Sequence, residues 1–97
     1  MVYTKNRFEW DPQKAQLNLK KHGVAFDVAL TAFDDPAAIV KSDPKHSVNE
    51  LRSALIGLSD EGILFVVFTI RGADGIFRII SARKANRKER KLYEENK

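Results

Sequence analysis

Hydrophobic residues in the first third of the chain show a short alternation and then a helical spacing. Phe8 and Trp10 alternate with charged residues, which predicts a short half-buried strand. A helix should follow directly, because Asp11 suits the N-cap and Pro12 suits the first helical position, where its missing N–H is no loss. Gly23 suits the left-handed conformation that commonly ends a helix, so we expect the helix to stop there.

The apolar residues that come next predict a second, shorter helix over residues 27–33. They recur at helical spacing, at Phe26, Ala29, Leu30 and Phe33. The pair Asp35-Pro36 then ends the segment, since proline cannot continue a helix.

From residue 37 onward the pattern predicts strands separated by polar or glycine-containing turns. The predicted strands cover residues 37–41, 51–58, 63–70 and 76–82, and a last helix covers 84–94. Residues 63–70 are apolar on both faces except for Thr69, which is typical of a central strand. The last three strands are joined by four-residue turns and predict an antiparallel meander. We therefore expect one α+β domain over residues 1–97, an antiparallel meander sheet with two N-terminal helices and a basic C-terminal helix packed on it.

Composition narrows the functional classes. The chain has 97 residues, of which 43% are hydrophobic and 31% charged, as in a globular domain. It has no cysteine, which excludes disulfides, zinc–thiolate sites and thiol nucleophiles, and its two isolated histidines, His22 and His46, do not predict a metal site. No cofactor is implied. The sequence shows neither a membrane-length apolar run nor a signal peptide, so we expect a cytoplasmic protein.

The positive charge of the chain lies in its last element. Residues 83–97 hold seven Lys/Arg and three Asp/Glu, whereas residues 1–82 hold ten of each, so the net charge of +4 comes from the C-terminal segment alone. Cations clustered beside a compact sheet suit a polyanion such as RNA. A basic but merely solvated helix would show the same composition, and charge alone does not decide between the two.

The order and spacing of several motifs resemble the BrnT family of toxins from bacterial type II toxin–antitoxin modules. The motifs are residues 8–12, 18–26 and 33–36, then Ile56-Gly57, Thr69-x-Arg71, residues 78–85, Glu89 and Tyr93. The resemblance implies a compact ribonuclease of the RelE-like type, an RNA substrate and a ribbon-helix-helix antitoxin that neutralises the toxin and binds operator DNA. This chain has Ile70 and Phe68 where relatives often have Glu and Tyr, and neither side chain can transfer a proton.

RNA can be cleaved by its own 2′-hydroxyl, which attacks the neighbouring phosphorus. The protein must then accept the 2′ proton, stabilise the extra negative charge and protonate the leaving 5′-oxygen. Arginine suits the second task, because its planar guanidinium grips two phosphate oxygens, and it does not suit proton transfer, because its pKa lies above about 12. We therefore expect arginines to hold the phosphate and other side chains to move protons.

Arg71 and Arg83, which end neighbouring predicted strands, are the expected catalytic clamps. Simple hairpin register separates them by several residues, so both reach one phosphate only if the strand bends or the helix folds back. Arg83 and Arg87 are four residues apart and would share a face at the start of the last helix. Further cations are expected to bind RNA, namely Arg52, Arg78, Arg87, Lys20 and Lys21. A purely structural alternative for Arg78 is an ion pair across the sheet with Glu50.

His22 and Glu50 are the expected proton-transfer residues. Histidine titrates near neutral pH, although His22 also complements the dipole at the end of the first helix, which would be reason enough for its position. Glu50 could act as a base supported by Arg52, or it could be an ordinary surface carboxylate. Glu89 could also act, with a helical contact to Tyr93 as its alternative.

These residues lead to one main hypothesis and two alternatives. The main hypothesis is a toxin that cleaves RNA without a metal and inhibits translation. The first alternative is a catalytically inactive RNA- or antitoxin-binding module of the same fold, which the residues at positions 68 and 70 favour. The second is a small DNA-binding regulator, which the absence of helix-turn-helix spacing disfavours.

Overall fold

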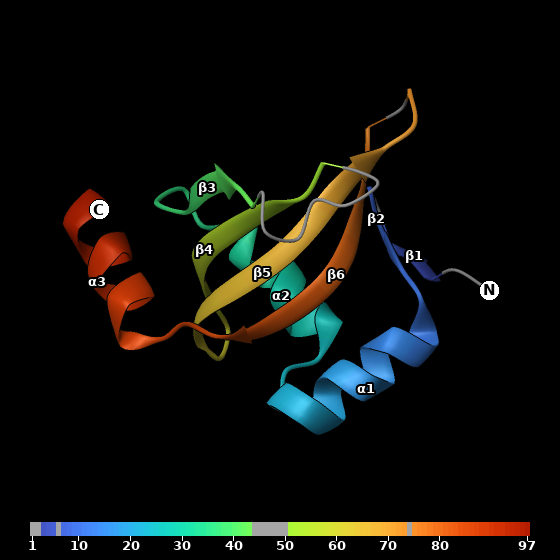
Figure 1. The fold of residues 1–97 in the computed structure, drawn as a ribbon, viewed down its shortest axis with the longest axis horizontal. Coiled ribbons are helices and arrows are strands. Elements are labelled where there is room, and N and C mark those ends of the chain that lie inside the picture. The colour runs from blue at the N-terminus through green and yellow to red at the C-terminus, as the bar shows by residue number, and fades with distance from the viewer. Residues whose placement is uncertain (1–2, 6, 44–50, 74) are drawn as a thin grey trace.

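The computed structural model describes residues 3–5, 7–43, 51–73 and 75–97, which form strands and helices around a single sheet (Figure 1). In chain order the elements are β1 (Tyr3–Lys5), β2 (Phe8–Trp10), α1 (Pro12–His22), α2 (Phe26–Ala32), β3 (Ile39–Ser42), β4 (Ser53–Ser59), β5 (Gly62–Arg71), β6 (Ile76–Lys84) and α3 (Arg87–Asn96). The α+β class is confirmed, and the two N-terminal helices lie within one residue of their predicted bounds. Strand β1 was not predicted.

The sheet is mixed, with the strand order β1-β2-β6-β5-β4-β3 over the described residues. Strands β3 to β6 pair antiparallel, but β2 pairs parallel with β6, with Phe8 opposite Phe77 and Glu9 opposite Arg78. The expectation of an antiparallel meander therefore misses this parallel pair. The reason is that β2 is far from β6 in sequence, so no local turn reveals their pairing.

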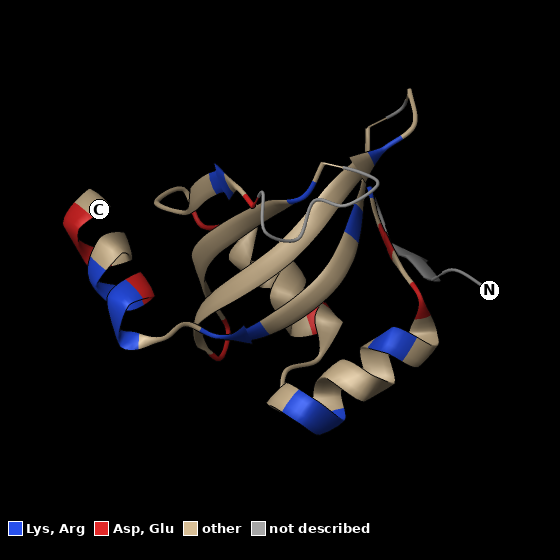
Figure 2. Ribbon diagram, in the orientation of Figure 1, with Lys and Arg blue, Asp and Glu red and all other residues tan. Residues whose placement is uncertain are grey.

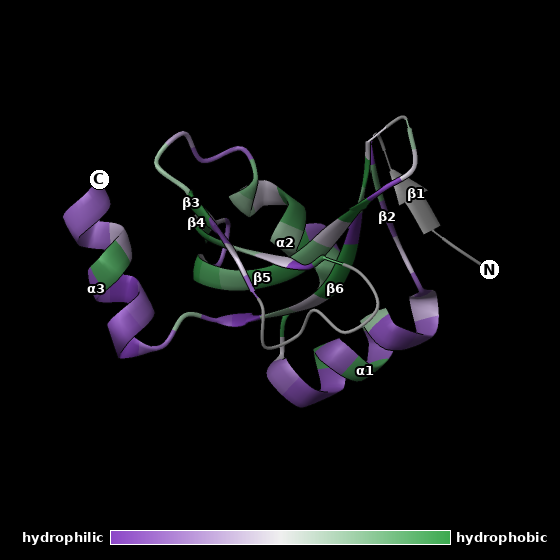
Figure 3. Cartoon of the chain, turned by 45° about the horizontal axis from the view of Figure 1, so that its top comes forward, coloured by the Kyte–Doolittle hydropathy of each residue, from purple (hydrophilic) through white to green (hydrophobic). Residues whose placement is uncertain are grey.

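One face of the sheet is closed by α2, which lies behind β4, β5 and β6 in Figure 1. The buried core lies between them and is strongly apolar, as the colouring of Figure 3 shows. It includes Phe26, Ala29, Leu55, Leu64, Val66, Phe68 and Ile79. The helix approaches β4 so closely that a Cβ atom on Gly57 would lie 2.8 Å from the carbonyl oxygen of Ala32. Glycine at position 57 is therefore a packing requirement.

Helix α1 is attached to the edge of β6 by one buried asparagine. Asn18, only 7% exposed, donates from Nδ2 to the carbonyl oxygens of Ala82 (2.8 Å) and Val24 (2.9 Å), and its Oδ1 accepts from the N–H of Ala82 (3.1 Å). Strand β2 pairs with β6 only at Phe77 and Arg78, so the asparagine amide replaces a neighbouring strand at Ala82. The same contact fixes the C-terminal turn of α1 beside the sheet.

Helix α3 follows an extended segment after β6 and contacts the body beside β4 instead of covering a face of the sheet (Figure 1). It begins at Arg87, three residues later than predicted, because β6 continues to Lys84 and Asn86 forms a capping box with Glu89.

One buried tyrosine anchors α3. The hydroxyl of Tyr93 donates to Asp35 Oδ2 (2.6 Å), which also accepts from the N–H of Leu58 (2.8 Å). The hydrogen bond from Tyr93 is the main cause that holds the pKa of Asp35 below its usual range, and the same bond raises the pKa of Tyr93 to about 12. The helical contact that we expected between Glu89 and Tyr93 is replaced by this bond and by the pairing of Glu89 described below.

Candidate functional site

A groove of about 250 Å3 lies on the face of the sheet opposite α2. Phe65 and Val67 lie on its floor and alternate along β5 with Leu64 and Val66, which belong to the core beneath α2. Segments far apart in sequence meet at this groove, whose lining residues are His22, Arg52, Phe65, Val67, Ile80, Ser81 and Arg83. Three of the predicted site residues, His22, Arg52 and Arg83, are therefore brought together.

Strand register brings the groove residues together. Arg83 lies opposite Phe65, and Ser81 lies opposite Val67, so the side chains of β5 and β6 share this face. The register shifts after Val67, since Phe68 lies opposite Ile79, and Ile80 is thus an extra residue on β6. This bulge places both Ile80 and Ser81 at the groove.

Two buried polar side chains position Arg52 and His22 at the groove. Thr69, only 3% exposed, donates to the carbonyl oxygen of Leu51 (2.8 Å) and holds the residues before β4 against β5. Asn18 holds the C-terminal end of α1 against β6, and His22 is the last residue of that helix. In the sequence, Asn18 and Thr69 stood out only as parts of motifs. Thr69 could have been identified by itself, because it is a polar residue in an otherwise apolar strand.

A second hollow of about 210 Å3 continues the groove over α1. It shares His22, Ile80 and Ser81 with the first and adds Lys14, Leu17, Asn18 and Lys21. Figure 2 shows Lys and Arg on α1, at the end of β6 and on α3. No carboxylate is among the described residues that line either hollow, whereas Lys14, Lys21, Arg52 and Arg83 are.

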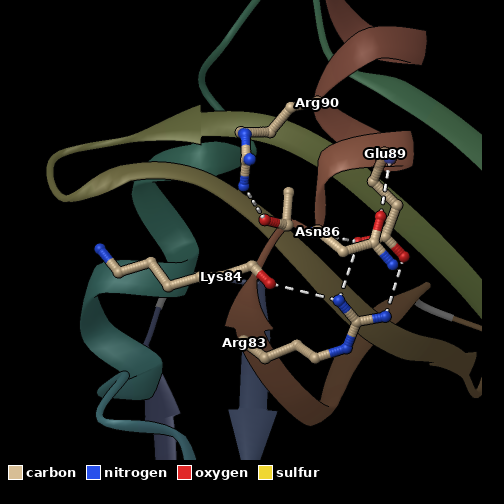
Figure 4. A network of polar contacts seen from close by, with 6 residues as sticks. Arg83, Lys84, Asn86, Glu89 and Arg90 are labelled. Carbon is tan, nitrogen blue, oxygen red and sulfur yellow. Dashed lines mark hydrogen bonds and ion pairs between the residues drawn. The ribbon is translucent and has the colours of Figure 1, made fainter.

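Arg83 is held in place by a network of contacts (Figure 4). Its Nη1 donates to Glu89 Oε1 and its Nη2 to Glu89 Oε2, both at 2.8 Å, and Nη1 also donates to the carbonyl oxygen of Lys84 (3.2 Å). The guanidinium carbon lies 4.3 Å from the centre of the Phe65 ring. Hydrogen bonding to Glu89 raises the pKa of Arg83 despite partial burial. Burial raises the pKa of Glu89, but the bonds from Arg83 and from the N–H of Asn86 outweigh it and leave that pKa lowered.

Arg71 and Arg83 lie at opposite ends of the paired strands. Arg83 lies opposite Phe65, and Arg71 lies opposite Ile76, six positions further along β5. At about 3.3 Å per residue the two are separated by roughly 20 Å. The structure therefore does not bring Arg71 and Arg83 to one phosphate, as the hairpin register already indicated.

The other predicted cations lie elsewhere. Arg78 pairs with Glu9 of the neighbouring strand β2 (2.6 Å), and the alternative partner Glu50 lies outside the described residues. Arg87 is exposed at the start of α3, and Arg83 is in β6, so the expectation that they share one helical face is wrong. Lys20 and Lys21 are exposed in the last turn of α1, and only Lys21 lines the second hollow.

Glu50, a candidate for proton transfer, lies outside the described residues, as does His46, and the role of Glu50 stays a prediction. Within the described part of the chain, no group of three His, Cys, Asp or Glu side chains is placed to bind a metal ion. No helix among the described residues is long and apolar enough to cross a membrane.

The sequence model of one protein family, the ribonuclease toxin BrnT of type II toxin–antitoxin systems, matches residues 10–89. The chain belongs to the BrnT family. The match includes His22, Arg52, Arg83 and Glu89, and thus all the groove residues named above. BrnT membership implies a ribonuclease toxin with an RNA substrate and a cognate antitoxin. A search of curated proteins finds no match to this BrnT chain.

Proposed function

We propose that this BrnT chain is an endoribonuclease that cleaves RNA by attack of the 2′-hydroxyl, without a metal ion, and thereby inhibits translation. One observation carries the proposal: an imidazole and two guanidinium groups, from α1, the residue before β4 and the end of β6, line one groove without a carboxylate among its described lining. Proton transfer and stabilisation of negative charge are the two needs of this reaction, and these groups supply both.

In this proposal each group has a role. His22 takes the proton of the 2′-hydroxyl as its oxygen attacks phosphorus. Arg52 and Arg83 donate hydrogen bonds to the phosphate oxygens, whose negative charge grows as the phosphorane forms. The P–O5′ bond then breaks, the 5′-oxygen takes a proton from a water molecule, and the hydroxide left behind takes back the proton held by His22. The products are a 2′,3′-cyclic phosphate and a free 5′-hydroxyl, and His22 and the water molecule are regenerated.

The second hollow supplies a path for the rest of the RNA. Lys14 and Lys21 line it, and Lys20 lies in the same helical turn as Lys21. Ammonium groups at this spacing contact successive phosphates without reading sequence, so binding should weaken steeply with salt.

The partner in this proposal is a ribbon-helix-helix antitoxin that binds operator DNA, and the toxin is RelE-like and acts in the cytoplasm. The antitoxin covers α3 and the neighbouring strand edge. The support is the charge of residues 83–97, because an acidic or apolar segment placed there neutralises the cations and excludes RNA.

The test is cleavage of total RNA and of a defined oligoribonucleotide in EDTA. His22→Ala and Arg52→Ala should each lower kcat by about 10²-fold or more, since one removes a proton acceptor and the other a charge-stabilising donor. Arg7→Ala removes an exposed arginine near Gly75, away from the groove, and serves as the matched control. If cleavage stops in EDTA and returns with a divalent cation, the metal-independent mechanism is wrong.

Arg71→Ala tests which end of the sheet carries the active site. The groove proposal expects this variant to cleave RNA. Loss of cleavage in folded Arg71→Ala, together with full activity of His22→Ala, would move the active site to the far end of β5.

The second candidate function is an inactive module that binds RNA or the antitoxin. Phe68, which is 3% exposed, and Ile70, which is 57% exposed, supply no titrating group to the sheet. This alternative predicts salt-sensitive RNA binding without product. A 2′,3′-cyclic phosphate terminus on cleaved RNA would exclude it.

A further inference from the structure

The network around Arg83 suggests a function for Glu89 beyond that of a helix cap. Glu89 lies at the third position of α3, and its Oε1 accepts both from the backbone N–H of Asn86 (2.9 Å) and from Arg83 Nη1 (2.8 Å). Its side chain is 13% exposed, against 36% for Arg83. One carboxylate therefore closes the N-terminus of a helix and grips an arginine that lines the groove.

Glu89 and the carbonyl oxygen of Lys84 use only some of the donors of Arg83. A guanidinium has one N–H at Nε and two at each Nη. Among the hydrogen bonds of the described residues, Arg83 uses both N–H groups of Nη1 and one of Nη2. The Nε–H and the second Nη2–H remain, and in a planar guanidinium these two point the same way. They form the side-on fork that fits two oxygens of a phosphate.

The orientation of this fork is fixed from several directions. Glu89 holds the outer edge of the guanidinium, Phe65 lies against its face at 4.3 Å, and the carbonyl oxygen of Lys84 holds Nη1. The support itself is anchored, because Asn86 caps α3 and Arg90 Nη1 donates to the carbonyl oxygen of Ala85 (2.7 Å) (Figure 4).

We propose that Glu89 is a positioning residue of the ribonuclease groove, which orients the Arg83 guanidinium so that its Nε/Nη2 fork meets the phosphate undergoing attack. This inference rests on the function proposed above. Glu89 does not touch the RNA, and it acts through Arg83. A preorganised fork needs no rearrangement as negative charge develops on the phosphate, and misplacement by about 1 Å costs up to about 10²-fold in rate.

Glu89→Gln is the decisive variant. Glutamine also suits the third position of a capping box, so the helix cap is kept, but its amide presents one acceptor and one donor where the carboxylate presented two acceptors. Arg83 keeps its charge and loses one of the two bonds by which Glu89 fixes its orientation. We expect kcat to fall by about 10-fold or more with KM unchanged or lower. Glu95→Gln, the same change at an exposed position of α3, should leave both parameters as in the wild type.

A double variant isolates the route of action. If Glu89 acts only through Arg83, Glu89→Gln should lower kcat no further in an Arg83→Ala background. A wild-type kcat in folded Glu89→Gln would overturn the proposal, and Glu89 would then be a helix cap only. A rise in kcat/KM would also overturn it, since Glu89 would then compete with phosphate for Arg83.

A binding measurement that does not depend on RNA cleavage distinguishes the positioning role of Glu89 from the proposed ribonuclease activity. In NMR spectra of isotopically labelled protein, the Arg83 Nε–H resonance should shift when a 2′-O-methyl oligoribonucleotide, which cannot be cleaved, binds to the wild type. In Glu89→Gln that shift should be lost or strongly reduced. If the wild type shows the shift but cleaves no RNA, the catalytic proposal fails and the positioning of Arg83 stands. If RNA binds and leaves the resonance unmoved, the positioning proposal fails by itself.

Discussion

The two faces of the sheet differ in what holds them and in what they can do. The face beneath α2 is closed by apolar packing, with Phe26, Val66 and Leu64 nearly or fully excluded from solvent. The opposite face carries a groove whose cations are oriented by polar contacts, chiefly that between Glu89 and Arg83. The core face therefore supplies stability, and the groove face carries the charges that would be costly inside a core.

Phe26→Ala should have the largest effect on stability and tests the core side of this comparison. Phe26 is 2% exposed and packs edge-on against Trp10, so its removal should lower the free energy of unfolding by about 3–5 kcal/mol. Urea unfolding measures the loss. Arg52→Ala is the counterpart on the groove face, and it should change stability by under about 1 kcal/mol while lowering kcat by about 10²-fold or more. Equal stability losses in the two variants would show that the faces are not specialised.

Asn18→Ala should have an intermediate effect, because Asn18 joins the two regions. The change leaves the N–H and the carbonyl oxygen of Ala82 without their side-chain partner at a buried position. We expect unfolding to become easier by about 1–3 kcal/mol, measured in urea. Cleavage should also fall in the folded variant, because His22 is no longer fixed beside β6. Gln16→Ala, which removes an exposed amide from the same helix, is the control.

Tyr93→Phe should have the smallest effect, about 1 kcal/mol, because Asp35 keeps its bonds from the N–H groups of Ala37 and Leu58. The loss depends on pH. The lowered pKa of Asp35 means that its stabilisation is present above about pH 4 and is lost as pH falls through the lowered pKa. The raised pKa of Tyr93 means that its contribution is complete below about pH 10 and is lost as pH rises toward about 12.

Urea unfolding over a pH series therefore should show a constant gap between wild type and Tyr93→Phe near neutrality, which closes at both extremes. Asp34→Asn, a change at the exposed neighbouring carboxylate, should not alter the acid limb. A gap that stays constant from acid to alkali would mean that it does not come from the bond between Tyr93 and the ionised Asp35.

The sequence predicted well those parts of the fold that depend on neighbouring residues, such as helix ends. Asp11 accepts from the N–H of Gln13 and Gly23 adopts a φ of 72°, so both ends of α1 were predicted from capping chemistry. The predicted start of α3 was three residues too early, because the cations Arg83 and Lys84 resemble the beginning of the basic helix. The capping box Asn86-x-x-Glu89 is visible in the sequence and marks the observed start.

The candidate site was only partly predictable, since residue chemistry selects candidates and long-range pairing selects neighbours. His22, Arg52 and Arg83 were chosen by type, and they meet because of the β6 bulge and the bonds of Asn18 and Thr69. Phe65 was not considered, because a ring in an apolar strand resembles any core residue. Its place on the open face follows only from the register with Arg83.

Asn18 has one more consequence, which concerns assembly. The outer strand of a sheet offers free N–H and C=O groups to strands of other chains, and proteins must block such edges to avoid aggregation. Beyond its pairing with β2, the edge of β6 is occupied at Ala82 by the amide of Asn18, which supplies both an acceptor and a donor. An incoming strand would have to displace this buried amide together with α1. Asn18 thus protects this edge of a strongly apolar sheet against unwanted strand addition.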